Sequence, residues 1–262
     1  MNHKLAIFLY ALHGGGAEHA MLKLAGGIAD RGYDVDLILA RAKGELLNRV
    51  PKSVRLVDLR SSRALTALSP LIFYLRKERP KVLLSALHTN IIALWARALA
   101  KASTRIVVSE RNTLSREVQN FSSDIRWRLM PLLIRVFYRW ADDIVAVSKG
   151  VADDLSQTAH IPRRRIRVIY NPVVTPEFRC QSLEALEHPW FKPDAPPVLL
   201  AVGRLAAQKD FATLIRAFSQ IRRGRLMILG EGKERPALEE LVKQLDLQDK
   251  VSLPGFVENP YP

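Results

Sequence analysis

The sequence predicts an α/β protein with two doubly wound parallel sheets, the second of them incomplete. Short runs rich in Val, Ile and Leu alternate with segments whose apolar residues recur at helical spacing. The predicted strands are apolar almost throughout, which is typical of a parallel sheet covered by helices on both faces. A proline-rich stretch at 171–197 interrupts the alternation, and this break predicts a boundary between two domains.

The first domain is predicted at 1–176 and has seven strand-like runs. In order they are KLAIFLYA, DVDLILA, VRLVDL, KVLLSAL, TRIVVSE, DIVAVS and RIRVIY. The periodicity predicts helices at 17–30, 65–76 and 91–100, and one long helix between TRIVVSE and DIVAVS. Strands and helices in this order follow the βαβ rhythm of a doubly wound sheet.

A linker is predicted at 177–197, and a partial second domain follows at 198–262. Its strands are PVLLAVG, RLMILG and KVSLPGF, with helices predicted at 211–221 and 234–245. Because a doubly wound sheet usually continues for several more strands, this domain is expected to be incomplete.

The composition excludes a disordered protein and argues against a metal site. Of the 262 residues, 48% are hydrophobic and 25% are charged, as in folded domains. The single cysteine, Cys180, cannot form an internal disulfide, and one Cys with six scattered His is too few for a Cys/His metal cluster. The sequence has neither a membrane-spanning run nor a signal-peptide cleavage pattern. We therefore expect a cytoplasmic protein.

Positive charge is concentrated in the first two thirds of the chain. Residues 1–176 contain 28 Lys and Arg against 14 Asp and Glu, whereas residues 177–262 contain 12 of each. This asymmetry indicates a polyanionic partner, which is a nucleic acid, an anionic lipid surface or a phosphate-bearing substrate. The sequence carries no RNP, KH, helix-turn-helix or zinc-finger signature, so we expect no nucleic-acid partner.

A run of three glycines follows the first predicted strand directly. Gly14, Gly15 and Gly16 precede Glu18 at the start of a helix. Glycines let the backbone approach a ligand closely, and a helix N-terminus offers free N–H groups to a phosphate. The alternative is a tight strand-to-helix turn that binds nothing.

Two further glycine turns end strands of the second domain. Gly203-Arg204 is followed by Lys209, and two flexible cations beside a glycine turn can neutralise a diphosphate. The alternative is a pair of solvated basic residues. The turn Gly230-Glu231-Gly232 could hold a ribose or base edge, or could be a simple turn.

Polar residues also end two strands of the first domain. His88 could bind a sugar hydroxyl, steer a phosphate or move a proton, or it could be a satisfied histidine beside a cap formed by Thr89 or Asn90. At the end of the next strand, Glu110 is a possible catalytic carboxylate and Arg111 is a possible anion clamp. An internal salt bridge is the simpler alternative.

The segment Ile125–Trp140 interleaves arginines with large apolar residues. Arg beside aromatic residues on a helix suits an anionic membrane surface. The alternative is a helix with an apolar core face and solvated arginines. Pro131 is expected to kink this helix or to mark its start.

Taken together, these motifs resemble those of glycosyltransferase family 4, whose members are retaining enzymes of the GT-B fold. The resemblance covers essentially the whole chain and rests on GGGAE, HTN, NPV, VGRLAAQKDFATLIRAF, LGEG and LPGF. GRL with a following KD and a Gly-Glu-Gly turn is its most specific part. The resemblance implies transfer from a UDP- or GDP-linked sugar, with retention and without a cofactor or metal.

The family also implies roles for individual residues. Arg204 and Lys209 would contact the donor diphosphate, while Gly15 and Gly16 would let the first-domain loop approach the phosphates or the sugar. His88 would lie near that sugar. The nucleotide pocket would be lined by Gly230, Glu231 and Gly232 and by the segment at Gly255 and Phe256.

The resemblance departs from the family pattern at the end of the chain. In the family, two glutamates separated by seven residues and a final helix follow LPGF, whereas the sequence ends at Pro262 before either. We therefore expect a truncated product with an incomplete donor site.

The expected function is sugar transfer to a lipid-linked or surface-polysaccharide acceptor, by an enzyme peripheral to the inner face of the cytoplasmic membrane. The expected partners are the nucleotide-sugar donor, this acceptor and an anionic membrane surface. The alternative is a non-catalytic protein that binds an anionic lipid or a phosphosugar.

Overall fold

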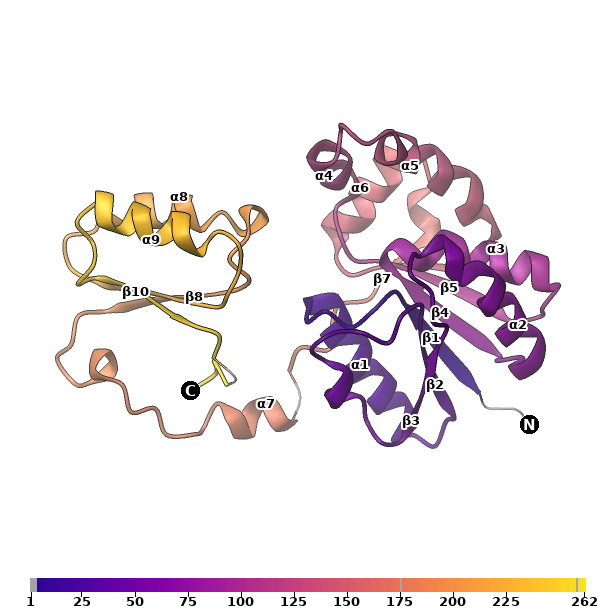
Figure 1. Cartoon of the computed structure of the whole chain (residues 1–262), viewed down its shortest axis with the longest axis horizontal. Helices are drawn as coiled ribbons and strands as arrows, with labels where there is room; N and C mark the ends of the chain where they lie inside the picture. Colours follow the sequence, from indigo (N-terminus) through magenta and orange to yellow (C-terminus); the bar gives the residue numbers. More distant parts are fainter. Residues whose placement is uncertain (1–3, 175, 258) are drawn as a thin grey trace. The chain divides into compact units, whose positions relative to one another are not determined.

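The computed structural model describes residues 4–174, 176–257 and 259–262. The chain divides into two compact units, Met1–Val173 and Val174–Pro262 (Figure 1). The proline-rich segment 177–197 lies in the second unit, where it includes most of the short helix α7 (Pro176–Gln181) and a 3₁₀ turn, η6 (Pro189–Phe191).

The first unit contains a seven-stranded, fully parallel sheet, as predicted. The strand order is β3-β2-β1-β4-β5-β6-β7, so the direction of winding reverses between β1 and β4. The strands are β1 (Leu5–Leu9), β2 (Val35–Leu39), β3 (Val54–Asp58), β4 (Val82–Ala86), β5 (Arg105–Glu110), β6 (Asp143–Ala146) and β7 (Ile166–Val168). Ligands of open α/β sheets bind beyond the carboxyl ends of the strands, next to such a reversal.

Helices cover this sheet from two sides. Apolar residues of α2, α3, α5 and α6 share one core with alternate strand residues such as Phe8 and Val108. Helix α1 shares a second core with the intervening residues, such as Ile7 and Leu37. The helices are α1 (Gly16–Ala29), α2 (Leu68–Glu78), α3 (Asn90–Ala100), α4 (Leu114–Asn120), α5 (Ile125–Phe137) and α6 (Lys149–Ala159).

Two features of these helices differ from the sequence-based expectation. The single long helix expected after β5 is two helices, α4 and α5, and Pro131 lies inside α5 rather than at its start. Helix α6 was not among the predicted elements, because its sequence KGVADDLSQTA is mostly polar; Ser148 caps it by accepting a hydrogen bond from Val151 N–H. No helix among the described residues is long and apolar enough to cross a membrane.

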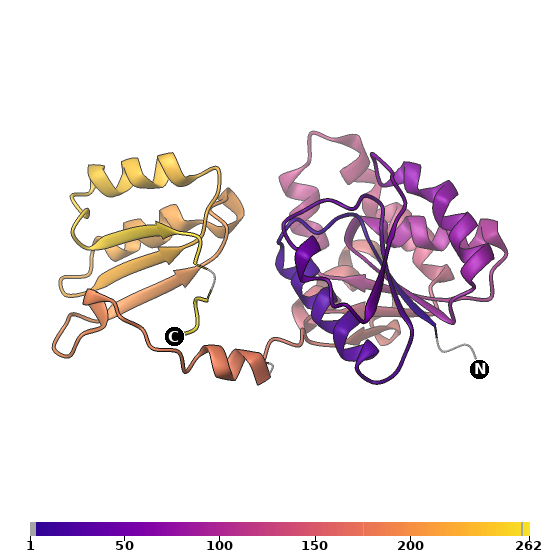
Figure 2. The same ribbon diagram turned by 60° about the horizontal axis from the view of Figure 1, so that its bottom comes forward.

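The second unit has a three-stranded parallel sheet in the order β10-β9-β8. Its strands are β8 (Val198–Val202), β9 (Arg225–Leu229) and β10 (Val251–Gly255). Helices α8 (Phe211–Phe218) and α9 (Arg235–Gln244) lie on one side of these strands (Figure 2). Their apolar faces pack on Leu226 and Ile228 of the central strand.

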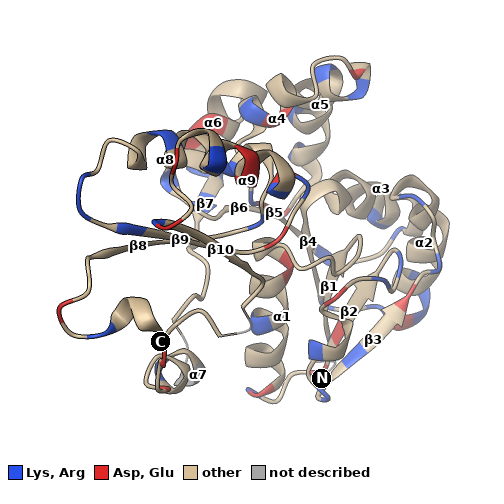
Figure 3. Cartoon of the chain, turned by 60° about the vertical axis from the view of Figure 1, so that its left-hand side comes forward, with Lys and Arg blue, Asp and Glu red and all other residues tan. Residues whose placement is uncertain are grey.

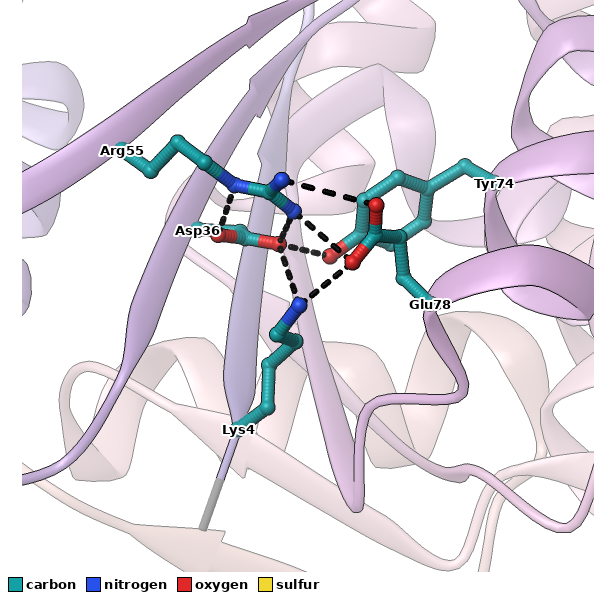
Figure 4. A network of polar contacts seen from close by, with 5 residues as sticks. All are labelled: Lys4, Asp36, Arg55, Tyr74 and Glu78. Carbon is teal, nitrogen blue, oxygen red and sulfur yellow. Dashed lines mark hydrogen bonds and ion pairs between the residues drawn. The ribbon is translucent and has the colours of Figure 1, made fainter. Parts of the chain in front are cut away.

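Charged side chains form a network at the amino-terminal edge of the first sheet (Figure 4). Asp36 on β2 is buried, and the Arg55 guanidinium on β3 donates to both of its carboxylate oxygens, at 2.7 and 2.5 Å. The Tyr74 hydroxyl on α2 donates to Asp36 Oδ2 at 2.5 Å. Glu78 accepts a hydrogen bond from Lys4 and is ion-paired with Arg55 at 3.0 Å. Within the network, each charge faces an opposite charge or a hydrogen-bond donor.

Candidate functional site

The loop after β1 is held in place by the loop after β2. Leu12 N–H donates to Lys43 C=O at 2.9 Å, and Leu46 N–H donates to Leu12 C=O at 3.2 Å. Gly44 (φ +126°) lies so close that a Cβ atom there would be 2.0 Å from the Leu12 carbonyl oxygen. Gly14 has a φ of +86°, which favours glycine. These contacts make the first part of the glycine loop a defined turn.

The three glycines of this loop differ in what they require. A Cβ atom on Gly15 would lie 2.3 Å from Glu18 Oε2, because the Glu18 side chain folds back over the start of α1. A Cβ atom on Gly16 would meet nothing within 4 Å. The positive φ of Gly14 therefore explains glycine there, whereas no contact within the chain explains it at Gly16, where the open space leaves room for a ligand.

The end of β4 turns sharply before α3. Leu87 has a φ of +63°, a conformation that is uncommon outside glycine and clusters at functional sites. The buried Thr89 hydroxyl holds the turn through hydrogen bonds to Phe8 C=O at 3.1 Å and Ala86 C=O at 2.8 Å. His88 is exposed, and its ring meets Trp127 edge to face at 5.4 Å between centroids. Thr89 stands at the cap position of α3, but its side chain makes no capping hydrogen bond.

Glu110 ends β5 in a buried cluster of hydrogen bonds. Its Oε1 accepts from the Tyr138 hydroxyl and, at 3.1 Å, from Asn90 Nδ2. Asn90 Nδ2 also lies 3.2 Å from Ser109 C=O and 3.0 Å from the Tyr138 hydroxyl. Burial raises the pKa of Glu110 to about 7, although the two hydrogen bonds favour its charged form. The carboxyl can therefore gain or lose a proton near neutral pH.

Arg111 does not form the ion pair with Glu110 that was the simpler alternative. Its guanidinium donates to Asn171 Oδ1, beyond β7, and lies 3.5 Å from Ser109 Oγ. Its Nε is buried without a hydrogen-bond partner among the described residues. Desolvation lowers the pKa of Arg111, while the nearby negative charge of Glu18 raises it.

The predicted residues of the first unit come together at one edge. Because β1 pairs with β4 and β4 with β5, the carboxyl ends of three adjacent strands lead to Gly16, to His88 and to Glu110. This edge includes the reversal between β1 and β4, where open α/β sheets bind ligands. No group of three or more His, Cys, Asp or Glu able to hold a metal ion occurs in the described parts of the chain.

The turns at the carboxyl edge of the second sheet require glycine for backbone packing. A Cβ atom on Gly230 (φ +136°) would lie 2.1 Å from Gly203 C=O, and one on Gly232 would lie 2.1 Å from Leu205 C=O. Leu205 N–H donates to Glu231 C=O at 2.9 Å. The ends of β8 and β9 are therefore pressed against each other, which positions Arg204.

Two cations lie free at this edge. The Arg204 and Lys209 side chains are exposed, and neither forms an ion pair with any described residue. The Lys209 stem lies over Gly203, because a Cβ atom there would be 3.6 Å from Lys209 Cε. Asp210 caps α8 by accepting from Thr213 N–H at 3.4 Å, which holds the turn that carries Lys209.

The remaining candidates of the second unit lie beside these cations. Glu231 is ion-paired with Arg235 at 2.8 Å, and the hydrogen bonds from Arg235 lower the pKa of Glu231. An added Cβ atom on Gly255 (φ +100°) would lie 2.9 Å from Glu231 Oε1. Phe256, directly after β10, is 72% exposed. The structure thus gathers all the predicted donor residues of this unit at the carboxyl ends of β8, β9 and β10.

Helix α5 has an exposed apolar stripe. Ile125, Leu129, Leu132 and Val136 recur at the spacing of one helix face, and each is at least 44% exposed. Ile134, on the opposite face, is buried in the core. Arginines lie along the same helix and the turn after it (Figure 3). Sequence periodicity alone could not show which face was exposed, so the core-face alternative stayed open.

Several contacts of the site were not predicted from the sequence. Tyr138 and Asn171 contact Glu110 and Arg111 from 28 and 60 residues away. Trp127 contacts His88 from α5. Long sequence separation leaves no local signal for such contacts, although the Arg-rich aromatic segment drew attention to Trp127 and Tyr138.

Family models and solved structures agree with this architecture. The model of glycosyltransferase family 4 matches residues 14–176, and that of group 1 glycosyl transferases matches residues 184–261. The structure of Anabaena HepE in complex with UDP and glucose superposes with a TM-score of 0.71 at 17% identity, covering 98% of this chain and 70% of HepE. The lipopolysaccharide outer core galactosyltransferase WaaB superposes with a TM-score of 0.67 at 18% identity, covering 98% of this chain and 69% of WaaB.

Among relatives of known function, one from Campylobacter jejuni subsp. jejuni serotype O:2 is 31% identical over 98% of this chain and 71% of its own length. It is the N-acetylgalactosamine-N,N'-diacetylbacillosaminyl-diphospho-undecaprenol 4-alpha-N-acetylgalactosaminyltransferase. The amylovoran biosynthesis glycosyltransferase AmsD of Erwinia amylovora is 24% identical over 96% of this chain and 68% of AmsD. The chain therefore belongs to glycosyltransferase family 4 and has the GT-B fold.

Proposed function

We propose that the protein transfers a sugar, with retention, from a nucleotide-sugar donor to a lipid-linked or polysaccharide acceptor. The observation that carries the donor assignment is the pair of free cations, Arg204 and Lys209, beside the packed glycine turns of the second sheet. The acceptor assignment is supported by the Campylobacter relative, whose name specifies a diphospho-undecaprenol substrate, and by AmsD, which acts in amylovoran biosynthesis.

The arrangement of side chains suits the chemistry of such a transfer. The bond between the sugar C1 and the diphosphate oxygen breaks, C1 bonds to an acceptor hydroxyl oxygen on the same face, and the hydroxyl proton passes to the departing diphosphate. Negative charge grows on the departing diphosphate, where Arg204 and Lys209 would stabilise it. UDP bound to HepE supports a nucleotide donor of this class.

In the first unit, we assign the sugar contact to His88 and the close backbone approach to Gly15 and Gly16. His88 is exposed beside the reversal point, and the space beside Gly16 is open. A phosphate at the start of α1 would compete with the Glu18 carboxylate that now folds over Gly15. Glu110 remains a catalytic candidate through the neutral-range pKa of its carboxyl.

The donor assignment is tested by calorimetric titration of the 262-residue chain with UDP and GDP. We expect one nucleotide to bind, and we expect Arg204→Gln and Lys209→Gln each to weaken it about tenfold or more, because each removes a charge-assisted contact. Arg222→Gln is the matched control, since Arg222 is an exposed arginine of the same unit in the turn before β9. Equal affinities of the wild type and both variants would refute the assignment.

A membrane surface is the partner that α5 suits best. The exposed stripe would enter the headgroup region, while Arg128, Arg135 and Arg139 would face anionic lipids at about 1 kcal/mol each. From Ile125 to Trp140 the sequence has no acidic residue. This surface would place the protein on the inner face of the cytoplasmic membrane.

Vesicle sedimentation tests this surface. Phosphatidylglycerol-containing vesicles should bind the chain more tightly than phosphatidylcholine vesicles, and salt should weaken that binding. Leu129→Gln/Leu132→Gln and Arg128→Gln/Arg135→Gln should each release the chain. Arg164→Gln, which removes an exposed arginine elsewhere in the first unit, should not. Binding that is independent of lipid charge and of α5 would contradict the proposal.

A sugar-transfer assay distinguishes the proposed enzyme from the alternative, a non-catalytic protein that binds an anionic lipid or phosphosugar. Release of nucleotide from a UDP- or GDP-sugar that depends on an undecaprenyl diphosphate-linked sugar would exclude this alternative. NMR of the product then gives the anomeric configuration. An inverted product would contradict retention.

A further inference from the structure

The loops after β2 and β3 line an open polar pocket, which does not include residues of the glycine loop or His88. Its volume is about 340 Å³, and it is lined by Arg41, Ala42, Asp58, Arg60, Ser61 and Ser62. This volume is near the lower end for small-molecule sites, so it suits one sugar or one diphosphate group. The pocket opens at the carboxyl edge of the sheet, where the candidate site also lies.

The backbone around this pocket is held by one carboxylate. Asp58 Oδ1 accepts from Ala42 N–H at 3.0 Å and from Arg60 N–H at 2.9 Å, which joins the two loops. Arg60 has a φ of +51°, a conformation uncommon for arginine, and Ser61 N–H donates to Ala40 C=O at 2.7 Å. The pocket is therefore built by specific contacts that fix where both arginines leave the backbone.

The two arginines of the pocket are free to bind an anion. Both are exposed, and neither guanidinium has a hydrogen bond or ion pair to any residue that the structure describes. Arg55, earlier on the same strand as Asp58, differs because Asp36 and Glu78 occupy its donors. Asp58 is the acidic residue in the lining, and two backbone N–H groups already occupy one of its oxygens.

The chemistry of the lining favours a phosphate. Guanidinium groups donate in a planar fork that matches phosphate oxygens, and hydroxyl groups such as that of Ser62 add further donors. Lys43 and Arg63, in the same two loops, add positive charge nearby, and neither forms an ion pair with a described residue. The backbone bond between Leu12 and Lys43 connects this pocket to the glycine loop.

We propose that the Arg41–Arg60 pocket binds the phosphate or diphosphate group of the acceptor. The identity of the ligand as the acceptor rests on the proposed function. Anchoring the phosphate there would hold the acceptor hydroxyl at a set distance, beside the loops that carry Gly16 and His88. A phosphate attached to a lipid and the phosphate of a soluble sugar would use the same contacts.

The test measures binding to the whole 262-residue chain, without catalysis. Wild type, Arg41→Gln/Arg60→Gln, Arg204→Gln and Arg164→Gln are titrated with inorganic pyrophosphate, geranyl diphosphate and UDP, after circular dichroism shows that each is folded. Arg164 is the matched control, since it is an exposed arginine just before β7, at the opposite edge of the same sheet. Saturating UDP in the pyrophosphate titration occupies any donor site in the second unit.

We expect the double variant to bind pyrophosphate and geranyl diphosphate about 10- to 100-fold more weakly and to bind UDP as the wild type does. Arg204→Gln should bind UDP more weakly than the wild type and should bind both other diphosphates as the wild type does. Tighter binding of geranyl diphosphate than of pyrophosphate would identify a lipid-linked phosphate, and equal binding would identify a phosphate on a soluble ligand.

The proposal would be overturned if the double variant bound each diphosphate with the same affinity as the wild type. It would also be overturned if Arg164→Gln weakened diphosphate binding as much as the double variant does. If neither the wild type nor any variant bound UDP, while the double variant still lost diphosphate binding, the donor assignment would be refuted and the pocket proposal would stand.

Discussion

The two edges of the first sheet differ in whether their charged side chains are paired. At the amino edge, Lys4 and Arg55 meet Asp36 and Glu78, and the Tyr74 hydroxyl completes the network. At the carboxyl edge, Arg41 and Arg60 form no ion pair with any described residue, and the Nε of Arg111 has no hydrogen-bond partner among them. Both edges belong to one sheet and one chain, so the difference does not come from composition.

This contrast separates charges that stabilise the fold from charges that are available to a ligand. A buried carboxylate such as Asp36 is costly unless it is paired, so its partners are part of the folded structure. An exposed cation without a partner costs little and keeps its full charge for binding. We therefore expect substitutions of the paired charges at the amino edge to change stability, and substitutions of the exposed, unpaired cations at the carboxyl edge to change binding.

The largest expected effect is at Asp36. Asp36→Asn removes the charge that holds Arg55 and Tyr74, and we expect it to lower the free energy of unfolding by about 3 kcal/mol. Urea unfolding measures this loss. Asp143→Asn is the control, because Asp143 pairs with the exposed Arg105 and Arg167 and should cost less than about 1 kcal/mol. Similar losses in the two variants would break the contrast.

A second effect depends on pH and lies at the carboxyl edge. Because the pKa of Glu110 is raised to about 7 in the folded state, its contribution to stability is present below about pH 4.5 and is lost as pH rises through 7. Glu110→Gln lacks this titration. Its free energy of unfolding relative to the wild type should therefore improve by about 2 kcal/mol between about pH 5 and about pH 8.

The pKa of Glu78 is shifted in the opposite direction to that of Glu110, so the pH dependence of its contribution to stability has the opposite sign. Hydrogen bonds from Lys4 and Arg55 lower the pKa of Glu78 to about 2, so its contribution is present above about pH 4.5 and is lost towards acid. Glu78→Gln should be least stable, relative to the wild type, at neutral pH. Parallel pH profiles of the Glu110 and Glu78 variants would show that the two carboxyls are not perturbed in opposite directions.

The smallest expected effect on stability is at the pocket arginines. Arg41→Gln and Arg60→Gln should each change the free energy of unfolding by less than about 0.5 kcal/mol, because both side chains are exposed and neither guanidinium forms a hydrogen bond or ion pair with a described residue. The same urea unfolding experiment measures this change. A loss above about 1 kcal/mol in either variant would place these arginines among the stabilising charges.

Much of the fold was predictable from local sequence pattern. All ten predicted strands are present, because a parallel sheet covered by helices needs near-continuous apolar runs that stand out from their surroundings. The long predicted helix was wrong in one respect, since residues 121–124 separate α4 from α5. Helix α6 was missed, although Ser148 gave a capping signal that could have located its start.

The candidate site was predictable in part, for the same reason. Gly16 and His88 come shortly after strands and Glu110 ends one, and parallel pairing places these strand ends at one edge. The pairing of Glu110 with Tyr138 was not predictable, and the ion pair with Arg111 that was considered is not formed. The arginines of the pocket looked from the sequence like any other solvated cations.

By itself, the sequence determined the strands, the alternation with helices, and which motifs stand at strand ends, because these depend on neighbouring residues. Only the tertiary structure decided which charges are paired. Asp36 and Tyr74 are 38 residues apart and in direct contact, whereas Arg41, five residues beyond Asp36, has no charged partner among the described residues. An ion pair needs atoms within about 4 Å, and the folded chain sets that distance.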